Sequence, residues 1–277
     1  MSSTAETRSV RVDGASIRVQ VRHAVGGSGI PLVLANGIGA SLEMLQPFVD
    51  GLPRDVEVVR FDVPGVGGSA PRRRPYRFCG LARMLRRLLV GLGYERVDML
   101  GVSWGGGLAQ QFALTERQFC RRLVLASTAT GALMIPGSPH VLKLMATPRR
   151  YRDPDFARQI AGTIYGGAMR AHPERAADLL GQIENRVGAS TGYWLQLFAL
   201  AGWTSLPWLP LIRQLTLILA GDDDPLVPLV NSRIITRLIP RARLHVYHDG
   251  HLALLTDAAT LAPLVADFLS EPDPEET

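Results

Sequence analysis

Residues 97–108 read V-D-M-L-G-V-S-W-G-G-G-L, and this stretch constrains the fold more than any other part of the sequence. Its first six residues form an apolar run of strand length, and helical spacing begins at about Leu108. A chain that passes from strand to helix in so few residues must turn very tightly, so Ser103 at the apex has a strained backbone. Gly101 and Gly105 flank Ser103 at positions where a Cβ would clash. We therefore predict a strand, a sharp turn and a helix.

The same residues match G-x-S-x-G, the pattern of a nucleophile elbow. A Gly- and Ser-rich turn can match this loose pattern by chance. Here the strand before the turn and the helix after it are both present, as the pattern requires. The context favours the chemical interpretation, and we predict that Ser103 is a nucleophile.

Strands and helices alternate through most of the chain. Residues 10–21 alternate apolar and polar side chains around an Asp13-Gly14 turn, as in a β-hairpin. Further strands are expected at 30–35, 56–61, 97–102, 123–127, 215–220 and 243–247, and helices at 81–92, 105–117, 229–238 and 258–269. This order predicts an α/β fold with a mostly parallel sheet that is flanked by helices.

The alternation stops after about residue 132 and resumes at about residue 210. The residues between are helical, aromatic and rich in loops. We therefore expect a core made of residues 1–133 and 210–277, with residues 134–209 forming a helical cap inserted before the last two strands. Ligands of open α/β sheets bind at the carboxyl ends of the strands, so the cap should cover that edge.

Composition excludes several classes of protein. The net charge is +5, but no helix-turn-helix, zinc-finger or RNP pattern accompanies it, so we expect no nucleic-acid partner. No apolar run approaches the roughly 20 residues of a membrane span, and the first residues lack a signal-peptide core. We expect a cytoplasmic protein without a membrane span. No oligomeric state is predicted.

Two residue types suggest structural rather than chemical roles. Cys79 and Cys120 make no metal pattern, and we expect both to be small buried hydrophobes; no metal or cofactor is predicted. The arginines cluster, and we interpret them as a solvated basic face. The cluster consists of Arg72, Arg73, Arg74, Arg77, Arg83, Arg86 and Arg87.

A serine nucleophile needs a general base, which is usually histidine. His251 lies in Asp249-Gly250-His251, just past the last strand, on the sheet edge where Ser103 is expected. We predict that His251 is the base, and His248 is its main competitor.

The base needs a carboxylate that orients its ring. The strand at 215–220 ends in Gly221-Asp222-Asp223-Asp224, and any of the three carboxylates could serve. An acidic surface turn is the alternative. The chain order Ser…Asp…His is that of α/β-hydrolases and differs from the orders in chymotrypsin and subtilisin.

A tetrahedral intermediate needs hydrogen-bond donors for its oxyanion. One is expected to be the backbone N–H of Trp104, directly after the nucleophile. The other is expected from the loop Asn36-Gly37-Ile38-Gly39, where Ile38 would donate its N–H. A phosphate-binding loop is excluded because no G-x-x-x-x-G-K-[ST] pattern follows.

Six sequence blocks resemble the bacterial intracellular depolymerases of medium-chain-length polyhydroxyalkanoate, within the α/β-hydrolase superfamily. They are F-D-V-P-G-V-G-G-S (61–69), G-V-S-W-G-G (101–106), T-P-R-R-Y (147–151), T-I-Y-G-G (163–167), G-W-T-S (202–205) and A-G-D-D-D-P-L-V-P (220–228). Several lie in the expected cap, which is the variable part of the superfamily. The resemblance implies Ser103 as nucleophile, Asp224 as acid and His251 as base, and a cytoplasmic serine hydrolase at polyester storage granules.

The substrate side depends on the cap. Its most aromatic segment holds Trp194, Trp203 and Trp208, which we predict to be exposed beside the active-site mouth and to contact polymer; packing of the cap onto the core is the alternative. The rival functions are a general carboxylesterase or lipase, a carbon–carbon bond hydrolase, and a non-catalytic granule-coat protein. A polyester synthase is disfavoured because it resembles this fold with cysteine at the elbow.

Overall fold

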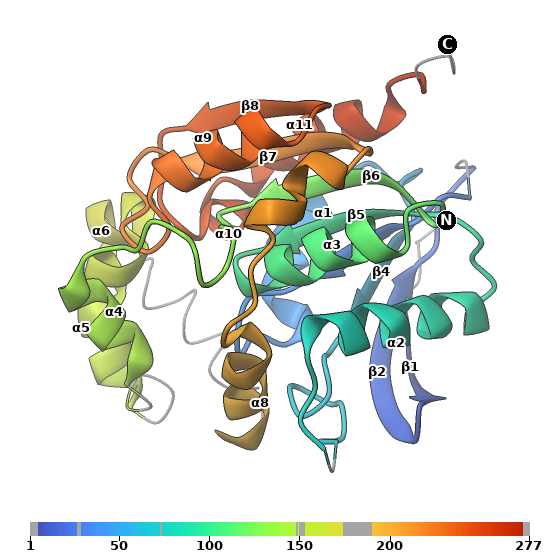
Figure 1. The fold of residues 1–277 in the computed structure, drawn as a ribbon, viewed down its shortest axis with the longest axis horizontal. Helices are drawn as coiled ribbons and strands as arrows, with labels where there is room; N and C mark the ends of the chain where they lie inside the picture. The colour runs from blue at the N-terminus through green and yellow to red at the C-terminus, as the bar shows by residue number, and fades with distance from the viewer. Residues whose placement is uncertain are drawn as a thin grey trace.

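Figure 1 shows a computed structural model of the chain, which describes residues 5–26, 29–72, 74–147, 149, 153–173 and 190–273. In this part of the chain eight strands form one sheet in the order β1-β2-β4-β3-β5-β6-β7-β8. β2 pairs antiparallel with both β1 and β4, and all other neighbours are parallel. The predicted α/β-hydrolase architecture with a mostly parallel sheet is confirmed.

Most strands lie close to their predicted positions, although β1 begins at Ala5 and the hairpin was predicted from residue 10. The strands are β1 (Ala5–Val12), β2 (Ala15–Arg22), β3 (Leu32–Ala35), β4 (Val58–Phe61), β5 (Val97–Val102), β6 (Cys120–Ala126), β7 (Leu215–Gly221) and β8 (Ala242–Tyr247). β6 begins three residues earlier than its sequence predicts, because two arginines there are held at the sheet. Arg121 forms hydrogen bonds of 2.9 and 2.6 Å to the buried Asp98, and Arg122 donates to the Phe268 carbonyl.

Helices cover both faces of the sheet (Figure 1). α2 (Phe78–Gly91), α3 (Trp104–Thr115) and α9 (Leu229–Leu238) contribute to the core on one face. η1 (Leu42–Leu45), α1 (Gln46–Gly51), α10 (Ala253–Thr256) and α11 (Ala258–Ser270) contribute to the core on the other. Successive side chains of the central strands alternate between the two cores, as in β5, where Met99 joins the first and Leu100 the second.

The chain between β6 and β7 begins with a loop and is mainly helical from residue 139 on, where it is described. It holds α4 (Pro139–Ala146), α5 (Pro154–Tyr165), α6 (Gly167–Ala171), α8 (Ser190–Leu200) and η3 (Leu206–Leu211). In Figure 1 α4, α5 and α6 lie together at one edge of the molecule, and α8 lies apart from them. Small apolar clusters join α4 and α5 to Leu226, and α5 and α6 to Leu252. This insertion therefore contacts the loops that follow β7 and β8.

The prediction for the two cysteines is half right. Cys120 is buried in β6, and burial raises the pKa of its thiol. Cys79 is exposed on α2, so its expected place in the core was wrong. α2 buries Phe78, Leu81 and Ala82 next to it, and position 79 falls on the opposite face of the helix.

The basic cluster is partly engaged with the rest of the protein. Arg87 pairs with Asp13 at 2.6 Å, and Arg86 pairs with Glu116 at 3.3 Å. Arg77 donates two hydrogen bonds to carbonyls at the end of α8. Arg73 lies outside the described residues.

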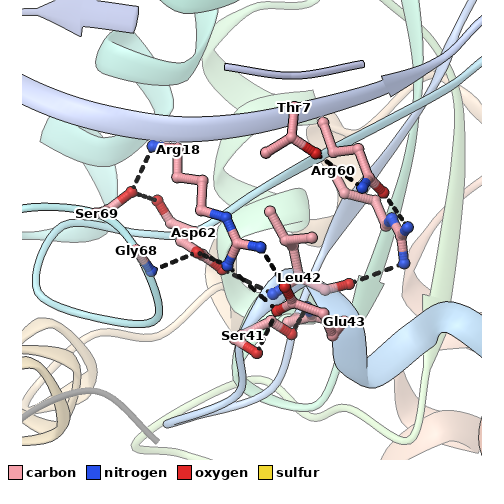
Figure 2. Close-up of polar contacts among 11 residues, drawn as sticks. Thr7, Arg18, Ser41, Leu42, Glu43, Arg60, Asp62, Gly68 and Ser69 are labelled. Carbon is pink, nitrogen blue, oxygen red and sulfur yellow. Dashed lines mark hydrogen bonds and ion pairs between the residues drawn. The ribbon is translucent and has the colours of Figure 1, made fainter. Parts of the chain in front are cut away.

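A polar network joins β2, β4 and the start of η1 (Figure 2). The buried carboxylate of Asp62 accepts hydrogen bonds from the Leu42 N–H at 2.7 Å and the Gly68 N–H at 2.8 Å. Arg18 bonds to both Asp62 and Glu43. The loop after β3 is thus tied to the loop after β4 by charged hydrogen bonds.

The two carboxylates in this network have opposite pKa shifts. Burial raises the pKa of Asp62, although amide hydrogen bonds oppose the shift. Burial acts in the same direction on Glu43, but hydrogen bonds from Arg18 and Ser41 outweigh it and lower the pKa of Glu43 from 4.5 to about 2. A lowered carboxyl pKa stabilises the fold above pH 4.5, and this contribution is lost as the pH falls toward 2.

We therefore expect Glu43→Gln to lower the free energy of unfolding at pH 7 by on the order of 1 to 3 kcal/mol, the range for hydrogen bonds to charged groups. The deficit relative to the native sequence should shrink as the pH falls from 4.5 toward 2. Urea titrations at several pH values would measure it. Glu6→Gln is the control, since its pair with Arg8 is exposed and 3.8 Å long. A deficit that stays constant with pH would contradict the assignment.

Candidate functional site

Ser103 lies at the sharp turn between β5 and α3, as its motif predicts. Its φ is 53° and its ψ is −118°, outside the conformations that non-glycine residues prefer. The turn is held on both sides: the Ser103 N–H donates to the Ala126 carbonyl at 2.9 Å, and Thr128 donates its hydroxyl to the Ser103 carbonyl at 2.7 Å. The strain is therefore enforced by neighbouring segments.

The glycines around Ser103 permit a close backbone approach. A Cβ on Gly101 would lie 2.4 Å from the Gly105 carbonyl oxygen, and one on Gly105 would lie 2.1 Å from the Ala35 carbonyl oxygen. Neither position accepts a side chain without moving the backbone. The predicted reason for these glycines is confirmed.

His251 and Asp224 form a buried pair near Ser103. His251 follows β8, and its Nδ1 lies 2.8 Å from Asp224 Oδ2. The other oxygen of Asp224 accepts the N–H groups of Leu226 and Val227 at 2.9 and 2.8 Å. An ionised carboxylate can only accept, so Nδ1 carries the proton and Nε2 is left as the basic nitrogen.

The other two aspartates have different partners. Asp222 bonds to His248, whose side chain is 96% exposed. Asp223 accepts hydrogen bonds from a single Arg170 nitrogen, Nη1, at both carboxylate oxygens (2.7 and 2.9 Å), and it accepts the Gly167 N–H at 2.7 Å. The alternatives that the sequence leaves open are thus separated by geometry, since only Asp224 is paired with the buried histidine.

The insertion between β6 and β7 reaches the loops that carry this pair. The His251 N–H donates to the Tyr165 carbonyl at 2.7 Å, and the two rings stack with centroids 6.3 Å apart. A Cβ on Gly250 would lie 1.9 Å from the same Tyr165 oxygen, and one on Gly166 would lie 1.9 Å from the Asp223 oxygen. This contact was not predicted, although T-I-Y-G-G is one of the blocks that carries the resemblance.

The loop after β3 passes beside Ser103. A Cβ on Gly37 would lie 3.7 Å from the Ser103 Cβ. Gly39 has a φ of 74°, and Asn36 donates its side-chain amide to the Ser41 carbonyl at 2.7 Å. Ile38 and Trp104, the expected oxyanion donors, line the same cavity as Ser103.

Two cavities meet at Ser103. The larger has a volume of about 280 Å³ and a mostly apolar lining that includes Met134, Leu142, Leu197 and Trp203. The smaller, of about 50 Å³, is lined by Ser103 together with His251, Leu252 and Tyr165. Ser103 therefore lies between the larger, apolar cavity and the smaller cavity that His251 lines.

The three tryptophans of the aromatic segment are not equivalent. Trp194 is 55% exposed and Trp208 is 51% exposed, as expected. Trp203 is partly buried, because its ring contacts Phe78 at 4.7 Å between centroids and its indole N–H donates to Gln111 at 2.9 Å. Trp203 therefore packs on the core and lines the larger cavity, so its predicted exposure was wrong.

Gln196 of α8 is a buried residue that the sequence argument missed. Its side-chain oxygen accepts the Gly39 N–H at 2.7 Å, and its carbonyl accepts the Trp104 indole N–H at 2.9 Å. A glutamine inside an apolar helical segment was the only local signal. Its partners are 157 and 92 residues away in the sequence.

Within the described residues, no group of three or more His, Cys, Asp and Glu side chains is arranged to hold a metal ion. No helix in that part of the chain is long and apolar enough to cross a membrane.

Comparison with known proteins gives one family. The family model for the α/β-hydrolase fold matches residues 30–258. A poly(3-hydroxyalkanoate) depolymerase from Ectopseudomonas oleovorans is 52% identical over 264 residues, which cover 95% of this chain and 92% of that protein. The match includes the insertion between β6 and β7.

Two solved structures share the fold at lower identity. An enol-lactonase from Burkholderia xenovorans superposes with a TM-score of 0.81 at 22% identity, over 95% of this chain and all of that one. An esterase from Exiguobacterium antarcticum gives a TM-score of 0.79 at 22% identity, over 95% and 99% of the two chains. At this identity they support the fold alone.

We expect Asp224→Asn to slow the reaction of Ser103 with a fluorophosphonate probe by about 10³- to 10⁴-fold, because His251 loses the carboxylate that fixes its tautomer. Asp222→Asn and Asp223→Asn are matched controls from the same turn and should slow the reaction far less, since neither carboxylate contacts the His251 ring. Labelling rates followed by intact mass would measure all three. If Asp223→Asn proved the slowest, the pairing of Asp224 with His251 would not be the functional one.

Proposed function

The chain belongs to the α/β-hydrolase family, and from that premise we propose that it hydrolyses the ester bonds of a poly(3-hydroxyalkanoate) with medium-length side chains, releasing 3-hydroxy acids or their oligomers. The observation that carries the proposal is the likeness to a depolymerase over almost the full length of both chains, insertion included. The buried pair of His251 and Asp224 beside a strained serine supports it.

The reaction proceeds through an acyl-enzyme. His251 Nε2 takes the proton of the Ser103 hydroxyl as its oxygen attacks the ester carbonyl, and Asp224 stabilises the imidazolium. The backbone N–H groups of Ile38 and Trp104 receive the oxyanion. His251 then gives its proton to the alkoxide oxygen of the leaving chain. A water molecule, deprotonated by the same nitrogen, frees the acid from Ser103.

The two cavities divide the substrate between them. The leaving group must lie on the side of His251, because that residue protonates it, so it faces the smaller cavity. The acyl part then extends into the larger apolar cavity beside Ile38 and Trp104. An alkyl side chain of medium length fits such a lining, since each buried methylene contributes about 0.8 kcal/mol.

Residues 134–209 act as a cap over this edge of the sheet, and the outer face of α8 meets the granule. Along α8, Tyr193, Leu197 and Leu200 line the larger cavity. Trp194 and Phe198, which are 55% and 43% exposed, lie one helical step away and point outward. An exposed apolar surface of this kind beside a cavity is typical of an interaction site. The protein is cytoplasmic and associates with storage granules through this surface.

To test the function, the native protein and Ser103→Ala would be compared on latex of a medium-chain polyester, latex of a short-chain polyester and p-nitrophenyl esters of increasing acyl length. We expect faster release of 3-hydroxy acids or oligomers from the medium-chain latex. For the soluble esters, kcat/KM should rise by up to about fourfold per methylene until the cavity is filled. Ser103→Ala should lose about 10⁴-fold or more in both assays.

Other outcomes would identify the rival functions. A general carboxylesterase would turn over the soluble esters and release nothing from either latex. A granule-coat protein would bind the particles, and Ser103→Ala would behave like the native protein in every assay.

The granule surface has its own test. Trp194→Gln should leave the melting temperature and soluble-ester turnover unchanged and weaken binding to polyester particles severalfold, because the ring is mostly exposed. Trp203→Gln is the contrast: it should lower the melting temperature and turnover, since Trp203 packs against Phe78 and lines the cavity. If Trp194→Gln lowered stability and both activities together, Trp194 would be a packing residue and the granule surface would lie elsewhere.

A further inference from the structure

α8 buries a polar side chain, that of Gln196, in an apolar stretch. Between Tyr193 and Leu200 the other side chains of the helix are apolar, yet Gln196 is only 1% exposed. Burying an amide is unfavourable unless it is hydrogen-bonded, so its partners matter. Gly192 and Ala199, which share its face, are buried against the body of the protein.

Both contacts of Gln196 fall next to an expected oxyanion donor. Its side-chain Oε1 accepts the N–H of Gly39 at 2.7 Å, and Gly39 directly follows Ile38. Its main-chain carbonyl accepts the indole N–H of Trp104 at 2.9 Å, and the backbone N–H of Trp104 is the second donor. One residue of the insertion therefore bonds to both segments that would bind the oxyanion.

The loop that carries Ile38 needs such a restraint. Gly37 and Gly39 flank Ile38, and Gly39 has a φ of 74°, so the backbone there has little conformational preference of its own. The far end of the loop is fixed, because the Leu42 N–H donates to Asp62 and the Ser41 carbonyl accepts from Asn36 (Figure 2 shows the Asp62 side). Closer to Ile38, the Gly39 N–H is buried, and the atom that accepts it belongs to Gln196.

We propose that Gln196 is a positioning residue that holds the Ile38 N–H in place for the oxyanion. This inference rests on the proposed function, because it assigns Ile38 a role in ester hydrolysis. Donors in an oxyanion hole act only if they are fixed before the charge develops, and removing one lowers kcat by about 10²- to 10³-fold. A donor that is loosened but still present should lower kcat by less, about tenfold or more.

The test uses Gln196→Met, which keeps the length of the side chain and removes the acceptor. Gln196→Ala is the second variant and leaves room for a water molecule at the Gly39 N–H. Gln214→Met is the matched control: Gln214, just before β7, is also buried, and its side chain donates to the carbonyls of Ala113 and Arg117 at the end of α3, far in sequence from the loop. Thermal unfolding, kcat and KM on a soluble p-nitrophenyl ester, and Ki for an alkyl trifluoromethyl ketone would be measured for each.

We expect both Gln196 variants to lower kcat about tenfold or more with KM nearly unchanged, and to weaken inhibition by the ketone by a similar factor, because its tetrahedral adduct carries the oxyanion. Gln214→Met should lower the melting temperature and leave kcat and Ki unchanged. The inference is overturned if Gln196 variants lose stability alone, if only KM changes, or if Gln214→Met loses kcat equally. The proposed function fails separately, when the native protein does not hydrolyse esters or Ser103→Ala remains active.

Discussion

The close approach of three backbone segments around Ser103 determines where the rest of the site can lie. The start of α3 lies against the end of β3 at Gly105. A Cβ at this position would lie 2.1 Å from the Ala35 carbonyl oxygen, so only glycine permits the contact. Ser103 is then held at its positive φ by the hydrogen bonds that its N–H and its carbonyl make with Ala126 and Thr128. Strain of this kind persists only where neighbours enforce it. The ends of β3, β5 and β6 are therefore locked together, and the loop after β3 must pass the serine.

The same principle joins the insertion to the other half of the site. Gly166, Gly167 and Gly250 bring the end of α5 into contact with the loops after β7 and β8, at distances that exclude any Cβ. Across this contact the His251 N–H donates to the Tyr165 carbonyl, and the side chain of Asp223, the neighbour of Asp224, accepts the Gly167 N–H. The insertion thus contacts both loops that carry the buried pair, and residues of the T-I-Y-G-G block make this contact.

Local sequence signals predicted the sheet, its helices and the residues that gather at its edge. α9 begins and ends where its periodicity predicts, and Ser103, Asp224 and His251 each follow a strand. The signals failed where the answer depends on which face a residue presents or on a distant partner. Cys79 is exposed because it lies on the outer face of α2, a helix that was predicted to begin only at residue 81, and Trp203 packs against Phe78, a residue far away in the sequence. Local sequence signals could not predict the role of Gln196, because the residue that its side chain bonds to is 157 residues away.

The side chains of α8 face three different surroundings. Gly192, Gln196 and Ala199 face the body, Tyr193, Leu197 and Leu200 face the larger cavity, and Trp194 and Phe198 face outward. Its carboxyl end is held by Arg77, which bonds to the Phe198 and Ala201 carbonyls and lies 4.0 Å from the Phe198 ring centroid. A helix held in this way presents its outer aromatic face at a fixed distance from the cavity. Under the proposed function, a polyester segment that leaves the granule at Trp194 needs to pass only the neighbouring face of the same helix to reach Ser103.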